Sequence, residues 1–211
     1  MARVAKAIAT FLCVVMAGVA LAQDTVRYRV DVTFNWTAAD DLDAHWSRLI
    51  AFAHSSRYSL FRDGETASSG LALLATNGRV SVLEAELAEG RRRGRVGEHV
   101  VLPGVASPGA FSFELMVDET LSGVSFATML APSPDWFSGA SGVPLRAEDR
   151  WRDQVTVVLW PWDAGADSGP DYTGPNVETQ PRQSVRLLTH PDFLTADGLA
   201  PIGQASFTRL P

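Results

Sequence analysis

The sequence predicts an all-β protein, an antiparallel β-sandwich with short helices in its loops. Three observations predict this class. Residues 26–36 alternate strictly between apolar and polar side chains, several β-prone segments follow in the second half, and turns containing Gly or Pro separate them. Strands at such spacing, without an internal repeat, are typical of a β-sandwich.

The first predicted strand, residues 26–36, gives the clearest signal. Its sequence, VRYRVDVTFNW, places apolar side chains at every even position and polar ones at every odd position. A period of two residues indicates a strand that buries one face.

The segment that follows mixes helical and extended signals. Residues 45–54 are predicted to be helical, because Trp46, Leu49 and Ile50 recur at intervals of three to four residues. Residues 80–87 are predicted to form a short helix that ends near Gly90. The basic run 91–95 is expected to be a solvated loop, with an anion or polysaccharide contact as the alternative.

The second half is predicted to be mostly β-strand. Residues 110–117 and 124–130 are strands separated by a polar turn, and residues 154–162 form a β-prone segment that ends at a proline. Residues 185–188 and 205–210 are candidate closing strands.

The first 22 residues are expected to be a signal peptide that leaves a domain of residues 23–211. Arg3 and Lys6 precede an apolar run, which ends in Ala20-Leu21-Ala22 ahead of Gln23. This pattern predicts cleavage after Ala22 and a secreted or periplasmic protein without a transmembrane span. An uncleaved anchor is the alternative.

The composition of residues 23–211 excludes one class of partner and favours another. Without Arg3 and Lys6 the chain has 16 arginines against 24 acidic residues, a formal charge of −8, and it has neither lysine nor cysteine. Nucleic acid is therefore not expected as a partner, whereas scattered carboxylates suit a divalent cation. The cysteine-free, all-arginine composition also favours a bacterial source.

Two acidic loops carry the residues most suited to chemistry. In residues 132–139, two prolines restrict the backbone that presents Asp135 directly after a strand. In residues 161–171, glycines allow the chain to curl so that Asp163 and Asp167 can face one point.

Carboxylates that are brought together repel one another unless a cation, a proton or water offsets the repulsion. A calcium ion could offset the repulsion, because it accepts six to eight oxygen ligands in flexible geometry. The alternative is a turn in which each aspartate accepts hydrogen bonds from nearby backbone amides. The spacing alone leaves both interpretations open.

The two loops also resemble the signature sequences of the spondin domain family. The strings are APSPDWFSG, residues 131–139, and WPWDAGADSG, residues 160–169, and the resemblance extends over roughly residues 28–189. It implies an eight-stranded, C2-like sandwich that binds calcium at one end and acts in extracellular adhesion or matrix recognition. By position, it implies that Asp135, Asp163 and Asp167 supply metal oxygens, with Glu114 as a weaker candidate.

Two other functions stay open. Asp135 with Asp163 or Asp167 could form the carboxylate pair of a glycoside hydrolase, although no HExxH, GxSxG or cysteine nucleophile is present, so no enzyme is predicted. A calcium-dependent surface for carbohydrate or lipid would use exposed Trp136 and Phe137 beside the ion. The expected partner is thus an unidentified protein, polysaccharide or lipid of the extracellular space or cell envelope.

Overall fold

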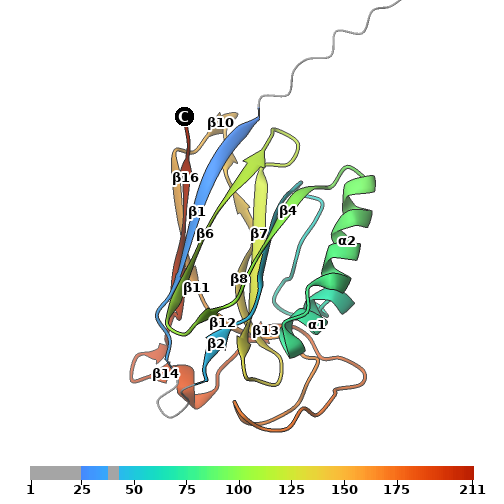
Figure 1. Ribbon diagram of the computed structural model, residues 1–211, viewed down its shortest axis with the longest axis vertical. Helices are drawn as coiled ribbons and strands as arrows, with labels where there is room; N and C mark the ends of the chain where they lie inside the picture. The colour runs from blue at the N-terminus through green and yellow to red at the C-terminus, as the bar shows by residue number, and fades with distance from the viewer. Residues whose placement is uncertain (1–24, 38–42) are drawn as a thin grey trace, which may run out of the picture.

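The computed structural model describes residues 25–37 and 43–211, which form two facing β-sheets with two helices on the outside of one of them (Figure 1). The strands are β1 (Val26–Phe34), β2 (His45–Trp46), β3 (Leu49–His54), β4 (Val96–Leu102), β5 (Val105–Ala106), β6 (Gly109–Val117), β7 (Gly123–Ala131), β8 (Trp136–Pro144), β9 (Arg146–Ala147), β10 (Arg150–Trp151), β11 (Gln154–Leu159), β12 (Pro161–Asp163), β13 (Arg186–Leu187), β14 (Leu194–Thr195), β15 (Gly198–Leu199) and β16 (Gly203–Arg209). The helices are α1 (Ser69–Asn77), α2 (Ser81–Arg92) and the 3-10 turn η1 (Pro191–Phe193).

The prediction of an all-β sandwich with short helices is confirmed. One sheet has the strand order β11-β16-β1-β6, and its neighbouring strands are antiparallel. The other has the order β13-β12-β8-β7-β2-β5, with β3 paired to both β7 and β4. Eight of the described strands are six residues or longer, and these make up most of the two sheets.

The main core lies between the two sheets. The even positions of β1, such as Tyr28 and Val30, are buried, as the alternation of residues 26–36 predicts. They belong to one apolar cluster with Phe207 from their own sheet and with Ala51 and Phe126 from the facing sheet. Burial of such side chains supplies most of the free energy that holds the sheets together.

A second core lies between the helices and the outer face of the second sheet. Leu71 and Leu74 of α1 and Leu83 of α2 are fully buried in one cluster with Phe52 of β3 and Met129 of β7. The middle strands of this sheet are therefore covered on both faces, which explains their continuous apolar sequences.

The predicted helix at residues 45–54 is wrong. Its residues form β2 and β3, and all six residues of β3 are buried, including His54. Because both faces of β3 are covered, its sequence does not alternate, and its apolar side chains matched a helical spacing by coincidence.

Helix α2 confirms the helix predicted for residues 80–87, and it continues to Arg92. Helix α1 was not predicted from the small apolar residues 71–75. It begins after Ser68, whose hydroxyl accepts a hydrogen bond from the amide of Leu71 at 3.1 Å, and it ends at Gly78 with φ of +68°. These are the usual signals of a helix start and end.

Strand β8 was not predicted either. The segment 132–139 was expected to be a loop throughout, but the loop ends at Asp135 and β8 begins at Trp136. Small residues at 138–142 weaken the strand signal, and they are needed because β8 packs closely on β7. A Cβ atom at Gly139 would lie 2.1 Å from the carbonyl oxygen of Phe126.

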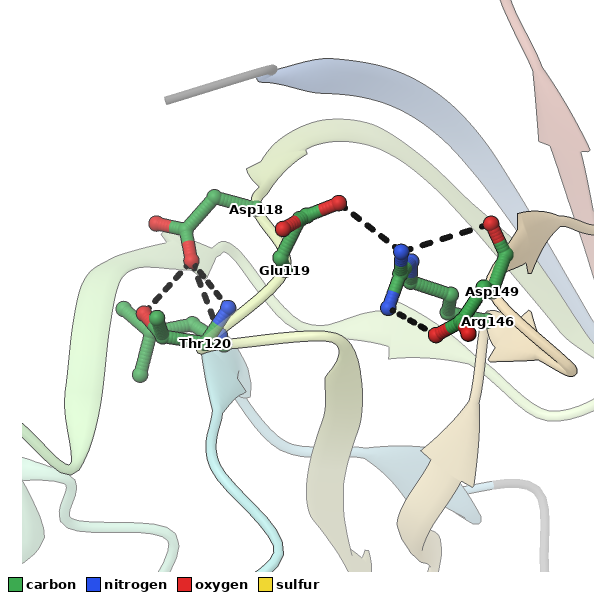
Figure 2. Close-up of polar contacts among 6 residues, drawn as sticks. Asp118, Glu119, Thr120, Arg146 and Asp149 are labelled. Carbon is green, nitrogen blue, oxygen red and sulfur yellow. Dashed lines mark hydrogen bonds and ion pairs between the residues drawn. The ribbon is translucent and has the colours of Figure 1, made fainter. Parts of the chain in front are cut away.

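Arg146 joins the turn between β6 and β7 to the turn between β9 and β10 (Figure 2). Its guanidinium donates to Glu119 at 2.8 Å and to Asp149 at 3.2 Å, and it lies 6.0 Å from the ring centre of Trp151. The neighbouring turn is closed by Asp118, which accepts three hydrogen bonds from Thr120 and Leu121.

We expect Arg146→Ala to lower the free energy of unfolding by about 1 kcal/mol, as measured by urea denaturation. Its acidic partners are exposed, so most of this loss comes from packing against Trp151 and not from the ion pairs. The control is Arg27→Ala, because Arg27 and Glu114 form a pair that is half-exposed on both sides. A control variant that loses as much stability as Arg146→Ala would contradict this assignment.

Within the part of the chain that the structure describes, neither helix has the length and apolar character needed to cross a bilayer. The predicted signal peptide, residues 1–22, lies outside the described residues.

Candidate metal centre

Asp135 ties the two acidic loops together. Its side chain is fully buried, and its Oδ2 atom accepts hydrogen bonds from the backbone amides of Ala166 at 2.6 Å and Asp167 at 3.0 Å. The carbonyl oxygen of Asp135 also accepts from the amide of Ala164 at 3.2 Å. The predicted approach of the 132–135 loop to the 163–167 loop therefore occurs in the fold.

Asp163 ends β12 and is 7% exposed. Its Oδ1 atom accepts from the amide of Gly165 at 2.7 Å, and its Oδ2 atom pairs with Arg186 at 2.8 Å. The first contact closes a turn that requires Gly165 in the left-handed region, with φ of +68°. The second contact joins this loop to β13.

Asp167 is 8% exposed and supports the long segment that follows it. Its Oδ1 atom accepts from the amides of Gly169 and Val177, both at 2.8 Å. Asp167 also forms an isolated β-bridge with Glu178. The structure shows the second interpretation, because all three aspartates accept hydrogen bonds from backbone amides, and the calcium interpretation stays a prediction.

One oxygen of this cluster has no partner. Asp135 Oδ1 is buried and makes no hydrogen bond among the described residues. Burial above all, and then the negative charges of Asp163 and Asp167, raise the pKa of Asp135, the two amide hydrogen bonds oppose the rise, and the net pKa is about 6. An ionised, half-satisfied carboxylate at this depth is costly unless a cation or a proton joins it.

The formal charges of the cluster do not cancel. The three aspartates carry three negative charges, and the guanidinium of Arg186 is the one positive group recorded against them within the described residues. One divalent cation, with a charge of +2, would balance the remaining charge of −2. In residues 25–37 and 43–211, no three His, Cys, Asp or Glu side chains, the three aspartates included, are placed so that they could hold a metal ion together, and backbone oxygens or water would have to take part in any site.

An open cleft of about 580 Å³ lies beside the cluster. Asp163 and Asp167 line it, together with Gln183, Arg186 and His190. The ring of Trp136 also borders the cleft, with its centre 4.8 Å from that of His190. A ligand in the cleft would therefore meet both acidic and basic side chains.

Comparison with known proteins identifies the family. The family model described as Spondin_N matches residues 26–195. The chain belongs to the Spondin_N family. The match covers the strands from β1 to β14 and includes both acidic loops.

The chain is also similar to animal spondins. It is 35% identical to spondin-2 of Rattus norvegicus over 91% of this chain and 64% of that protein, and 37% identical to spondin-2 of Homo sapiens over 79% of this chain and 54% of that protein. It is 35% identical to spondin-1 of Gallus gallus over 80% of this chain and 22% of that protein. The chain therefore spans less than two thirds of the length of these spondins.

Three further site predictions do not hold in this spondin domain. Glu114 lies on the exposed face of the four-stranded sheet, where it pairs with Arg27 at 3.6 Å and does not join the aspartates. Trp136 and Phe137 are 3% and 1% exposed, so they do not form an aromatic contact surface. Strand β8 begins at these two residues, and its two faces pack against the two separate cores.

Sequence reasoning missed Arg186 and the amides of Ala166 and Asp167. Backbone amides leave no mark in the sequence that would identify them as hydrogen-bond donors. The small residues around Ala166 and Asp167 were the one sign that the chain could curl there. Arg186 is 23 residues beyond Asp163 along the chain, and only the pairing of β12 with β13 brings the two together.

Proposed function

We propose that this domain is a calcium-binding, non-catalytic recognition module of the extracellular space or the cell envelope. Asp135, Asp163 and Asp167 would supply oxygens to the ion. The observation that carries the proposal is the buried Oδ1 atom of Asp135, which has no partner and lies among carboxylates whose net charge is −2 with Arg186 counted.

Calcium suits these donors for two reasons. All of them are hard oxygen atoms, and calcium tolerates the irregular mixture of carboxylate, carbonyl and water ligands that this loop pair can offer. Bound there, the ion would supply the charge that allows all three aspartates to stay ionised. The protein would already hold the two loops in place through the amide hydrogen bonds to Asp135.

A recognition role is supported by family membership and by the surface around the site. The spondin family suggests adhesion or matrix binding, and the predicted signal peptide at residues 1–22 would export the domain. The cleft of about 580 Å³ gives a ligand direct access to Asp163 and Asp167. A bacterial source stays a prediction from composition.

The same cleft favours a second candidate function, calcium-dependent binding of a carbohydrate or an anionic lipid. Hydroxyl and amide groups of Thr179, Gln183 and Thr189 line it beside the acidic oxygens, as a sugar or headgroup ligand would require. Binding assays with envelope polysaccharides and anionic vesicles, each with calcium and with chelator, separate this function from adhesion to a protein. Absence of any calcium-dependent binding would leave the ion a structural role.

We expect calcium to raise the melting temperature of the chelated domain by about 5–10 °C when its concentration is about a hundred times the dissociation constant. The ion binds the folded cluster and has no comparable site in the unfolded chain. Differential scanning calorimetry in chelator and after addition of calcium measures this shift. If the wild-type domain and Asp135→Ala melt alike in both conditions, the calcium proposal is wrong.

A further inference from the structure

Arg186 is fixed beside the aspartate cluster by the sheet itself. Asp163 and Arg186 are direct partners in the pairing of β12 with β13. The guanidinium donates to Asp163 Oδ2 at 2.8 Å and to the side-chain oxygen of Gln183 at 3.1 Å. The Asp163 side chain is only 9% exposed, whereas the Arg186 side chain is 59% exposed and borders the cleft.

The three aspartates are compensated unequally. Asp135 and Asp167 accept hydrogen bonds from neutral backbone amides, whereas Asp163 alone is paired with a charged group in the described part of the chain. A guanidinium keeps its charge at every pH at which proteins fold. Asp163 therefore carries a permanent counter-charge, and a metal ion that binds it must share this carboxylate with a second cation.

We propose that Arg186 is an internal counter-cation that stabilises the metal-free cluster and weakens its affinity for calcium. The inference rests on the proposed calcium site. In the metal-free domain, Arg186 offsets part of the repulsion among the three carboxylates. In the calcium-bound domain, the same positive charge repels the ion, so Arg186 sets the calcium concentration at which the module loads.

Opposite effects on the two states distinguish this role from ordinary structural support. A residue that merely holds the loops would, on removal, destabilise the metal-free domain and weaken calcium binding together. Removal of a counter-cation destabilises the metal-free domain but strengthens calcium binding. Because the Arg186 side chain is largely exposed, water screens its charge, and we expect a change of about tenfold in affinity.

The test compares Arg186→Gln and Arg186→Lys with the wild-type domain. Isothermal titration with calcium gives the dissociation constants, and Trp136 at the border of the cleft provides a terbium-luminescence signal as a second readout. We expect Arg186→Gln to bind calcium about tenfold more tightly at low ionic strength, with a smaller gain at high salt. Arg186→Lys retains the charge and is expected to stay within about twofold of wild type.

The melting temperature in chelator provides the second half of the test. Arg186→Gln leaves the buried Asp163 without its partner, and we expect a loss of about 3–6 °C. In an Asp163→Asn background the same substitution should cause no further loss. Arg27→Gln, which removes an exposed arginine of the other sheet, is the matched control and should change neither quantity.

The outcomes separate the two proposals. If wild type binds calcium and Arg186→Gln binds it equally or more weakly, the counter-cation inference fails and the calcium site stands. If Arg186→Lys, which keeps the positive charge, also binds calcium about tenfold more tightly than wild type, side-chain geometry and not charge sets the affinity. The inference then also fails. If wild type binds no calcium, the proposed function itself is wrong.

Discussion

Asp135→Asn is expected to raise the free energy of unfolding of the calcium-free domain by about 1 kcal/mol at pH 7, and to abolish its response to calcium. The pKa of Asp135 is raised from 3.8 to about 6, so keeping this carboxylate ionised costs about 2–3 kcal/mol. Asparagine removes the charge, and its side-chain oxygen can still accept from the amides of Ala166 and Asp167, but its buried NH2 group replaces the partnerless Oδ1 atom and offsets part of the gain.

The gain from Asp135→Asn should depend on pH in a defined direction. Above about pH 6 the folded wild type bears the full cost of ionised Asp135, and below 3.8 both the folded and unfolded states are protonated and the cost is gone. The stability difference between variant and wild type should therefore shrink as the pH falls from 7 to 4. His54 acts oppositely, because burial lowers its pKa and stability is lost as the pH falls below 6.5. It affects both proteins equally, so the difference between them isolates Asp135.

Chemical denaturation in chelator at several pH values measures this difference, and calorimetry with calcium measures the lost response. Asp153→Asn is a suitable control, since the Asp153 side chain is 95% exposed. An Asp135→Asn variant that is less stable than wild type in chelator, or that still gains stability from calcium, would refute the description of this site.

The second large effect is expected at Gly165. This residue has φ of +68°, and a Cβ atom there would lie 2.4 Å from the carbonyl oxygen of Gln183, whose amide donates to the Gly165 carbonyl at 2.7 Å. Gly165→Ala must therefore adopt a left-handed conformation and also push the 183 segment away. We expect a loss of about 2–4 kcal/mol in the free energy of unfolding, together with weaker calcium binding, because Asp163 accepts from the Gly165 amide.

Gly94 offers a control that separates strain from collision. It has φ of +64°, and a Cβ atom there would meet no atom within 4 Å. Gly94→Ala should therefore lose only about 1 kcal/mol, the cost of the left-handed conformation, and should bind calcium as wild type does. If Gly165→Ala and Gly94→Ala lose the same free energy of unfolding, the close approach of residues 165 and 183 adds nothing to the loss at Gly165.

Much of the fold could be predicted because its signals are local. The alternation in β1 and β6 reflects sheet faces that are buried on one side, and the sequence carries that pattern directly. Strands β3 and β8 could not be recognised, because β3 is covered on both faces and β8 is made of small residues that fit against β7. Their identity as strands depends on neighbours distant in the chain.

The candidate site divides in the same way. The types and positions of Asp135, Asp163 and Asp167, and the small residues that let their loops curl, were readable from the sequence. The sequence could not show which Asp135 oxygen is hydrogen-bonded and which has no partner. The amides of Ala166 and Asp167 donate to Asp135 Oδ2 only when the two loops meet in the fold.

The sequence by itself thus determined an all-β sandwich and two acidic loops that approach one another. The tertiary structure decided that Trp136 and Phe137 are core residues, that Glu114 lies elsewhere, and that Arg186 pairs with Asp163. The physical reason is that side-chain periodicity is a property of one strand, whereas burial and charge compensation depend on the register between strands that are separated in the sequence.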